Sequence, residues 1–348
     1  MTQRLPILGI TMGDPCGIGP EITAKALNMP AIYQRCCPLV VGSASIMEQA
    51  VKIAGVDLKV NPVKNVSDAL FTYGTIDVYD QPGIIEPEEV THGKVNAKGG
   101  EAAYQAIAKV IDLAMKNEID ATITGPLNKE ALNLAGRHYS GHTEIYADLT
   151  GTRDYSMMLA DGELRVVHVS THVSLREACD RCKKERVYNV IKLADKVCRS
   201  LGIENPRVAV AGLNPHAGEN GLFGREEIEE ITPAIEMARA EGLTVDGPVP
   251  PDTLFSKAKG GQYDIVVAQY HDQGHIPLKV TGFQYDYTTN KWKTVSGVNI
   301  TLGLPIIRSA VDHGTAFGKA GKGTANEESL VNAIDYGIRL AIDRINNA

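Results

Sequence analysis

Hydrophobic and polar positions alternate in two patterns along the 348 residues of the chain. Short continuous runs rich in Val and Ile, bounded by polar turns, are typical of strands buried on both faces of a sheet. These runs are LPILGIT, CPLVVG, IDATIT, LRVVHVS, RVAVAGL and DIVVAQ. Segments with helical spacing lie between them, and ESLVNAIDYGIRLAIDRI closes the chain with the same spacing. The alternation predicts an α/β protein with a largely parallel sheet.

Residues 283–297, FQYDYTTNKWKTVSG, depart from this pattern. Aromatic and polar residues alternate there around a Thr-Thr-Asn-Lys turn, which predicts a β-hairpin with Phe283, Tyr285 and Tyr287 on one face. Two interpretations stay open. The aromatic face packs on the body of the protein or on a partner subunit, or the hairpin is a flap over an active site.

Composition and charge exclude several classes of protein. The formal net charge is −7 and charges of both signs are mixed along the chain, without the basic stripe of a nucleic-acid-binding protein. No apolar run approaches the roughly 18 residues of a membrane span, and the apolar stretch near the N-terminus is too short for a signal peptide. Six cysteines form no recognisable disulfide framework, and we interpret the pair Cys179 and Cys182 as helix-packing thiols. A cytoplasmic protein is therefore expected.

Imidazoles follow three of the predicted strands: His172 after RVVHVS, His216 after RVAVAGL and His271 after DIVVAQ. Ligands of open α/β sheets bind beyond the carboxyl ends of the strands, where these residues are expected to gather. Neutral imidazole is a common ligand of borderline divalent metals, and three protein ligands with an open position suit a catalytic zinc-type site. Taken singly, each histidine is more often a hydrogen-bonded structural residue. The three placements together make a metal site as good an interpretation as a structural role, and this is the site that the sequence predicts.

A second group of polar residues suits an anionic ligand. Gly141-His142-Thr143-Glu144 precedes a helical segment, and a helix N-terminus offers backbone N–H groups to an anion. The alternative is a plain cap, with Thr143 or its neighbour as the N-cap residue. Lys279, Asn299 and Arg308 add positive charge and hydrogen-bond donors, and the planar fork of arginine binds two oxygens at once.

Two glycine-rich segments carry a further prediction. Asp312–Gly323 has too many glycines for a helix and predicts a loop whose backbone approaches a flat or phosphorylated ligand closely. Gly13–Gly19 lies between a strand and a helix, but a dinucleotide fingerprint needs a glycine where the chain has Ile22. The acidic residue expected some 20 positions later is also missing. The first loop is therefore interpreted as a strand-to-helix turn, not as a Rossmann phosphate cradle.

These motifs together resemble the 4-hydroxythreonine-4-phosphate dehydrogenase family over nearly the whole chain. The matching stretches are ITMGDPCGIGPEI, GPLNKEAL, GHTE, STHVSLRE, NPHAGENGLFGREE, PPDTLF, YHDQGHIPLK, GVNITLGLPIIRSAVDHGTA and AGKG. The glycine loop and HGTA are also similar to motifs of isocitrate and isopropylmalate dehydrogenases. The resemblance implies a two-domain fold of the isopropylmalate-dehydrogenase type, not Rossmann, and a homodimer with its active site in the cleft between domains. We expect a cofactor-side domain of residues 1–130 plus 285–348, and a substrate, metal and dimerisation domain of residues 131–284.

The resemblance also implies roles for individual residues. A divalent metal (zinc, or Mg, Co, Mn or Ni) is expected on His172, His216 and His271, with ligands from both subunits at each site. Substrate contacts are expected at His142, Thr143, Lys279, Asn299 and Arg308, and NAD contacts at Asp312, His313, Gly314, Thr315 and Ala316. Lys279 or Asp272 is expected to take the hydroxyl proton, and the alternative for Asp272 is to orient His271.

The expected reaction is metal-dependent, NAD-linked oxidation of the C3 hydroxyl of 4-phospho-D-threonate or 4-phospho-D-erythronate, followed by decarboxylation to dihydroxyacetone phosphate. GHIPLK, RDYSMML and NGLFG look more like this sugar-acid branch of the family. The alternative is the branch that oxidises 4-phosphooxy-L-threonine in pyridoxal phosphate biosynthesis. Residues 283–297 depart from the compact linker expected in the biosynthetic enzyme, which leaves the roles of Lys279 and Asn299 open. A phosphotransacetylase-like acyltransferase is the alternative of another class.

Overall fold

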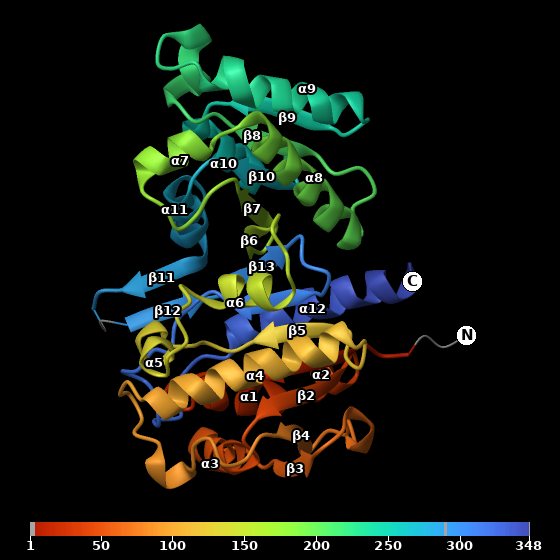
Figure 1. The fold of residues 1–348 in the computed structure, drawn as a ribbon, viewed down its shortest axis with the longest axis vertical. Helices are drawn as coiled ribbons and strands as arrows, with labels where there is room; N and C mark the ends of the chain where they lie inside the picture. Colours follow the sequence, from red (N-terminus) through yellow and green to blue (C-terminus); the bar gives the residue numbers. More distant parts are fainter. Residues whose placement is uncertain (1–3, 289–290, 348) are drawn as a thin grey trace. The chain divides into compact units, whose positions relative to one another are not determined.

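The computed structural model describes residues 4–288 and 291–347. The chain forms two compact units, unit 1 (Met1–Arg153 with Leu304–Ala348) and unit 2 (Asp154–Gly303). Figure 1 shows both red and blue segments in unit 1, because residues from both ends of the chain build it. Each unit consists of a mostly parallel sheet with helices on its faces, so the predicted α/β fold is confirmed. Among the described residues, no helix is long and apolar enough to cross a bilayer.

The sheet of unit 1 is entirely parallel. Its strands are β1 (Ile7–Thr11), β2 (Cys37–Gly42), β3 (Lys59–Val63), β4 (Thr75–Asp80), β5 (Ala121–Thr124) and β14 (Arg308–Val311). They lie in the order β3-β4-β2-β1-β5-β14. A Rossmann sheet runs 3-2-1-4-5-6 in chain order, so unit 1 has a different topology, as the sequence predicted.

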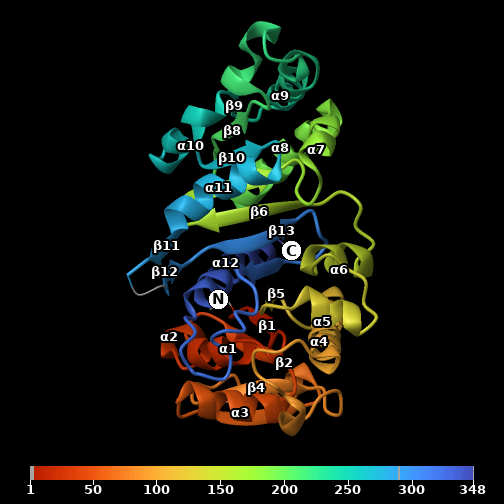
Figure 2. The same cartoon turned by 90° about the vertical axis from the view of Figure 1, so that its left-hand side faces the viewer.

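Helices cover both faces of this sheet. They are α1 (Gly19–Leu27), α2 (Pro30–Tyr33), α3 (Ala44–Ala54), α4 (Ala97–Met115), α5 (Lys129–Leu134), α6 (His142–Leu149) and α12 (Glu328–Asn346), with short 3-10 turns η1 (Val66–Asp68) and η2 (Pro87–Glu89). Neighbouring residues of a strand point to opposite faces. On β1, Leu8 lies against α12 at Gly337, whereas a side chain at Gly9 would collide with Val110 of α4. Figure 2 shows α4 and α12 on opposite sides of β1 and β5 accordingly.

The sheet of unit 2 is mixed. Its strands are β6 (Ser156–Asp161), β7 (Leu164–His168), β8 (Val208–Ala211), β9 (Val245–Val249), β10 (Ile265–Ala268) and β13 (Val298–Leu302). They lie in the order β13-β6-β7-β10-β8-β9. The pairings of β13 with β6 and of β6 with β7 are antiparallel, and the other three are parallel.

The helices of unit 2 are α7 (Leu175–Arg181), α8 (Lys184–Ser200), α9 (Thr232–Ala240), α10 (Pro251–Lys259) and α11 (His271–Gly282), with a 3-10 segment η3 (Pro215–Gly221) and a π-helical turn η4 (Glu227–Ile231). Helix α8 lies on one side of β8 and β10 and α10 on the other (Figure 2). A core that includes Val166, Val266 and Leu278 fills the face under α10 and α11. Cys182 is buried just after α7 and Cys179 lies within it; both are free thiols, as the packing interpretation requires.

The predicted hairpin is present. Strands β11 (Phe283–Asp286) and β12 (Lys291–Val295) pair antiparallel, and residues 289–290 of its turn lie outside the described part of the chain. Phe283 is half-buried, but Tyr285 and Tyr287 are 51% and 84% exposed. Packing on the body of this chain therefore covers only Phe283, and the partner-subunit and flap interpretations stay open for the two tyrosines.

The predicted domain boundaries at residues 130 and 285 differ from the observed divisions after Arg153 and Gly303. Helices α5 and α6 pack on α4, which keeps residues 131–153 in unit 1. Strand β13 pairs with β6, which keeps residues 285–303 in unit 2. The chain crosses between the units within ordinary turns, so composition does not mark the crossings.

Candidate active site

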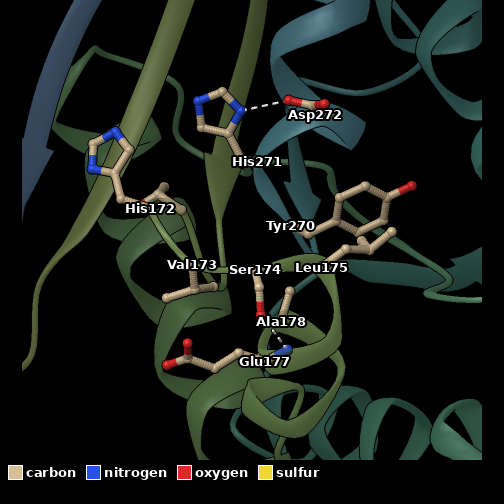
Figure 3. A pocket seen from close by; sticks show the side chains of 10 residues that line it. His172, Val173, Ser174, Leu175, Glu177, Ala178, Tyr270, His271 and Asp272 are labelled. Atoms are coloured by element: carbon tan, nitrogen blue, oxygen red, sulfur yellow. Dashed lines mark hydrogen bonds and ion pairs between the residues drawn. The ribbon is translucent and has the colours of Figure 1, made fainter.

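A pocket of about 540 Å³ opens in unit 2 where the segments after β7 and β10 meet (Figure 3). It contains three of the predicted site residues, His172, His271 and Asp272. Strands β7 and β10 are parallel neighbours, so their carboxyl ends bring the two histidines side by side. The ring centroids of His172 and His271 lie 5.9 Å apart. Ser174, the N-cap of α7, accepts a hydrogen bond from the Glu177 N–H and fixes the chain after His172.

His271 is held from two sides. Its Nδ1 lies 2.7 Å from Oδ1 of Asp272, an arrangement that leaves Nε2 for a metal. Its ring stacks on His275, with centroids 3.6 Å apart, and Nδ1 of His275 lies 2.9 Å from the His271 carbonyl oxygen. His168 lies behind His275, at 4.7 Å between ring centroids. Burial is the main cause that lowers the pKa of His275 to about 3 and of His168 to about 4, so both rings are neutral at pH 7.

His216 lies on η3, at the surface of unit 2. Five consecutive residues there, His216 to Asn220, have left-handed backbone conformation, with φ between 43° and 81°. Within residues 4–288 and 291–347 of this one chain, no three His, Cys, Asp or Glu side chains are arranged to hold a metal. The structure therefore brings together two of the three predicted ligands, His172 and His271, and not His216. A set of imidazoles with a carboxylate behind one of them fits a borderline divalent metal such as zinc.

A second cluster of predicted residues lies in unit 1 around Arg308, the first residue of β14. Arg308 is only 3% exposed, and its guanidinium donates hydrogen bonds to Oγ1 of Thr143 at 3.4 Å and of Thr124 at 3.2 Å. The guanidinium also lies 5.4 Å from the ring centre of Tyr146. Burial lowers the pKa of Arg308 to about 10, so the side chain stays cationic at neutral pH.

His142 begins helix α6 beside this cation. Gly141 is the N-cap residue and no side chain caps the helix, so the alternative interpretation, a plain cap by Thr143 or its neighbour, is wrong. Thr143 contacts Arg308 instead, because it lies within the first turn of the helix. Nε2 of His142 is buried and has no hydrogen-bond partner among the described residues. Burial and the charge of Arg308 hold the pKa of His142 well below its usual range, which leaves a neutral imidazole able to meet a polar ligand.

Lys279 and Asn299 lie in unit 2 away from the lining of the pocket, as far as the described residues show. Lys279 follows His271 and His275 at spacings of four on α11, and its Nζ lies 4.2 Å above the centre of the Phe283 ring. Asn299 is on β13, with Nδ2 at 2.9 Å from Sδ of Met157.

The loop Asp312–Ala316 follows β14 and contacts the glycine loop Gly13–Gly19 within unit 1. The Ile18 N–H donates to the Thr315 carbonyl oxygen at 3.1 Å. A Cβ at Gly17 would lie 2.8 Å from Cβ of Thr315, so only glycine permits this approach. Buried Glu21 adds a third segment, because its carboxylate accepts hydrogen bonds from the N–H groups of Gly321 and Gly323.

His275 and Glu21 belong to these sites, although the sequence did not predict either of them. His271 and His275 share the spacing of one helical turn, and this spacing would link them once the segment is assigned as a helix. Glu21 gave no comparable signal, because its partners lie 300 residues further along the chain.

Known proteins match the chain over almost its full length. The family model described as "Pyridoxal phosphate biosynthetic protein PdxA" matches residues 34–337. D-threonate 4-phosphate dehydrogenase of Cupriavidus necator is 47% identical over 345 residues, which cover 99% of this chain and 100% of that protein. The enzyme of the same name from Salmonella typhimurium is 48% identical over 336 residues, 96% of this chain and 98% of the relative. The crystal structure of 4-hydroxythreonine-4-phosphate dehydrogenase from Klebsiella pneumoniae superposes with a TM-score of 0.85 at 43% identity, covering 98% of this chain and 99% of that one.

Proposed function

Because the chain belongs to the PdxA family and is a dehydrogenase, we propose that it oxidises 4-phospho-D-threonate at the C3 hydroxyl with NAD. The resulting 3-oxo acid is a β-keto acid, which loses CO2 to give dihydroxyacetone phosphate. One observation carries this choice of substrate: relatives 47% and 48% identical over nearly the whole chain are named D-threonate 4-phosphate dehydrogenases. The C2 epimer, 4-phospho-D-erythronate, is included in the proposal as a second substrate. The same identities disfavour an acyltransferase.

The proposed metal ligands are His172, His216 and His271. A divalent metal bound there, zinc or Mg, Co, Mn or Ni, supplies a Lewis acid that lowers the pKa of a hydroxyl and polarises a carbonyl. The chain itself orients the ligands. Asp272 holds Nδ1 of His271 and leaves Nε2 for the metal, and the stacked ring of His275 restricts rotation of the imidazole.

The anionic groups of the substrate are proposed to be met by Arg308, Thr143 and His142. Arg308 is a buried cation beside the hydroxyl groups of Thr143 and Thr124, and the planar fork of a guanidinium suits the paired oxygens of a phosphate or carboxylate. Lys279 and Asn299 are proposed as further substrate contacts. The hydrogen bond of Asp272 to His271 favours an orienting role for that carboxylate and favours Lys279 as the group that takes the hydroxyl proton.

NAD is proposed to bind against the loop of Asp312, His313, Gly314, Thr315 and Ala316, where the glycine loop packs. Bound NAD supplies the hydride acceptor for oxidation at C3. The glycines allow the backbone to come close to a flat ligand, and Glu21 holds Gly321 and Gly323 of the same region in place.

A homodimer with metal ligands from both subunits is part of the proposal. One chain does not gather the three histidines among its described residues, which supports a contribution from a second copy. Unit 2 also exposes large apolar side chains of the kind that interfaces bury, namely Leu175, Leu222, Phe223, Ile276, Val280 and Tyr287. Six free thiols support a reducing compartment, the cytoplasm.

The decisive experiment is kinetics with 4-phospho-D-threonate, 4-phospho-D-erythronate and 4-phosphooxy-L-threonine side by side, followed by NADH absorbance at 340 nm. We expect the highest kcat/KM with 4-phospho-D-threonate, and stoichiometric release of CO2. Activity confined to 4-phosphooxy-L-threonine would assign the chain to the biosynthetic branch instead. A lack of NADH with all three compounds would overturn the proposal.

A further inference from the structure

The turn that carries His216 has a backbone that L-amino acids rarely adopt. Four of its five left-handed residues are not glycine, namely His216, Ala217, Glu219 and Asn220. Left-handed helical conformation brings Cβ of an L-residue too close to the following carbonyl oxygen, so each of these residues costs free energy. Such strain persists only where the surrounding structure determines the conformation, and it concentrates at functional sites. Contacts outside the turn must therefore hold it.

Glu227 makes contacts that hold this left-handed turn in place. The side chain is 3% exposed, and its Oε1 accepts hydrogen bonds from the N–H groups of Leu213 and Asn214, both at 2.8 Å. Its Oε2 accepts a third hydrogen bond from Nδ2 of Asn214 at 2.9 Å. Among the described residues, amide groups supply all the hydrogen bonds found for this carboxylate. Glu227 thus fixes the two residues through which the chain enters the left-handed turn.

The carboxylate also sets the shape of the turn by its bulk. A Cβ at Gly218 would lie 2.6 Å from Oε2 of Glu227, and a Cβ at Gly212 would lie 3.3 Å from Oε1. Gly218, at the centre of the turn, therefore packs directly on the carboxylate. The Glu227 carboxylate therefore contacts the backbone both before the turn, at Gly212, and at its centre, at Gly218.

The backbone of Glu227 is itself unusual. Glu227 is the first residue of the π-helical turn η4, which ends at Ile231 and leads directly into α9. Short π-helical turns occur frequently at functional sites, where they change the direction of side chains relative to a regular α-helix. An anchored helix thus presents a buried carboxylate to a strained turn that begins with an exposed imidazole, His216.

We propose that Glu227 is a positioning residue for metal binding: by fixing Leu213, Asn214 and the left-handed turn, it sets the place from which His216 reaches the metal. The inference rests on the proposed function, because it takes His216 as a ligand. The inference adds Glu227 to the metal site as a residue that contacts neither the metal nor the substrate.

The test is cobalt binding by the metal-stripped full-length protein, followed by the visible d–d absorption of Co²⁺. Glu227→Gln keeps the volume of the side chain but turns an amide donor toward Nδ2 of Asn214, so the turn loses an acceptor. We expect Co²⁺ affinity to fall by about 10- to 100-fold, as for other residues that support metal ligands, with an altered d–d spectrum. Saturating Co²⁺ should restore kcat. Gly218→Ala, which pushes on the same carboxylate, should weaken Co²⁺ binding in the same way.

Glu230→Gln is the matched control. Glu230 lies on the same π-helical turn and accepts hydrogen bonds from Nζ of Lys183 and the N–H of Lys184, away from the His216 turn. The Glu230→Gln variant should bind Co²⁺ with the affinity and spectrum of the wild type. Hydrogen exchange of the metal-free proteins adds a readout that does not depend on metal. The amides of Leu213 and Asn214 should exchange faster in Glu227→Gln than in Glu230→Gln.

The outcomes separate this inference from the proposed function. Wild-type Co²⁺ affinity and spectrum in both Glu227→Gln and Gly218→Ala would overturn the inference and leave the function standing. Cobalt binding that depends on Glu227, in a protein that oxidises none of the three substrates, would support the inference and overturn the function. Absence of Co²⁺ binding by the wild type would overturn both.

Discussion

His271 and His275 lie face to face, with ring centroids 3.6 Å apart and ring planes inclined by 11°. Both residues are on α11, one turn apart, and the inner ring is buried whereas the outer ring faces the pocket. The buried ring is neutral at pH 7, so the stack places no second positive charge behind the proposed metal. The proposed ligand thus rests on a rigid, uncharged surface.

Removal of this surface should weaken metal binding. In His275→Ala the imidazole of His271 gains freedom to rotate about its side-chain bonds, and we expect metal affinity to fall about 10-fold or more. His275→Phe keeps an aromatic face and should retain most of the affinity. Zinc competition against a chromophoric chelator measures both variants. Equal affinities for the alanine variant and the wild type would show that the stack is only packing.

Metal removal should abolish the reaction. A chelator is expected to eliminate NADH formation, and added Zn²⁺ to restore it, because oxidation and decarboxylation are both proposed to need a Lewis acid. His216→Ala should lose bound metal and turnover together, measured by metal analysis and by absorbance at 340 nm. Full NAD reduction by metal-free protein would contradict the proposed chemistry.

Arg308 should control affinity for the phosphorylated acid. Arg308→Lys keeps a positive charge but loses the planar fork, and Arg308→Gln loses the charge as well. Hydrogen bonds to charged groups contribute about 1.5–3 kcal/mol, so we expect kcat/KM for 4-phospho-D-threonate to fall roughly 10- to 150-fold in the glutamine variant. The KM for NAD should change little. A rise in the KM for NAD, without a change in kcat/KM for 4-phospho-D-threonate, would place Arg308 in cofactor binding instead.

Asp14, in the glycine loop, should make stability depend on pH. Burial raises its pKa from 3.8 to about 6, opposed in part by the hydrogen bond from the Cys16 N–H, and its Oδ2 has no partner among the described residues. The folded state therefore binds the proton more tightly than the unfolded state. The free energy of unfolding falls as pH rises from about 4 to about 6, and the penalty, about 3 kcal/mol, is complete above that window.

Asp14→Asn removes this titration and keeps an oxygen for the Cys16 N–H. Relative to the wild type, the variant should gain stability as pH rises from 4 to 7. Urea unfolding of both proteins at several pH values measures the difference. A difference that does not vary with pH would rule out titration of Asp14 as its cause.

The parts of the fold and site that could be predicted from sequence are those set by local geometry. Runs of Val and Ile became strands, and the parallel pairing of β7 with β10 brought His172 to His271 as the strand-end argument required. The alternation of aromatic and polar residues in 283–297 gave the hairpin. In each case the period of the side chains determines which residues share a face or an edge.

The parts that could not be predicted depend on contacts between distant segments. Glu227 acts on a turn whose left-handed backbone no sequence pattern announces, since four of its five residues disfavour it. Glu21 contacts Gly321 and Gly323, which are separated from it in the sequence by the whole of unit 2. The divisions after Arg153 and Gly303 depend on such contacts as well, because α6 and β13 belong to their units through their packing partners and not through their composition.

The interrupted order of unit 1 has a consequence for synthesis on the ribosome. Residues 154–303 emerge as one continuous block and can fold as soon as they leave the exit tunnel. Unit 1, by contrast, lacks β14 and α12 until unit 2 has been made, so the face of β5 and β1 that α12 covers stays bare until then. Synthesis of residues 304–348 therefore determines when the nascent chain can cover this apolar face and withdraw it from chaperones.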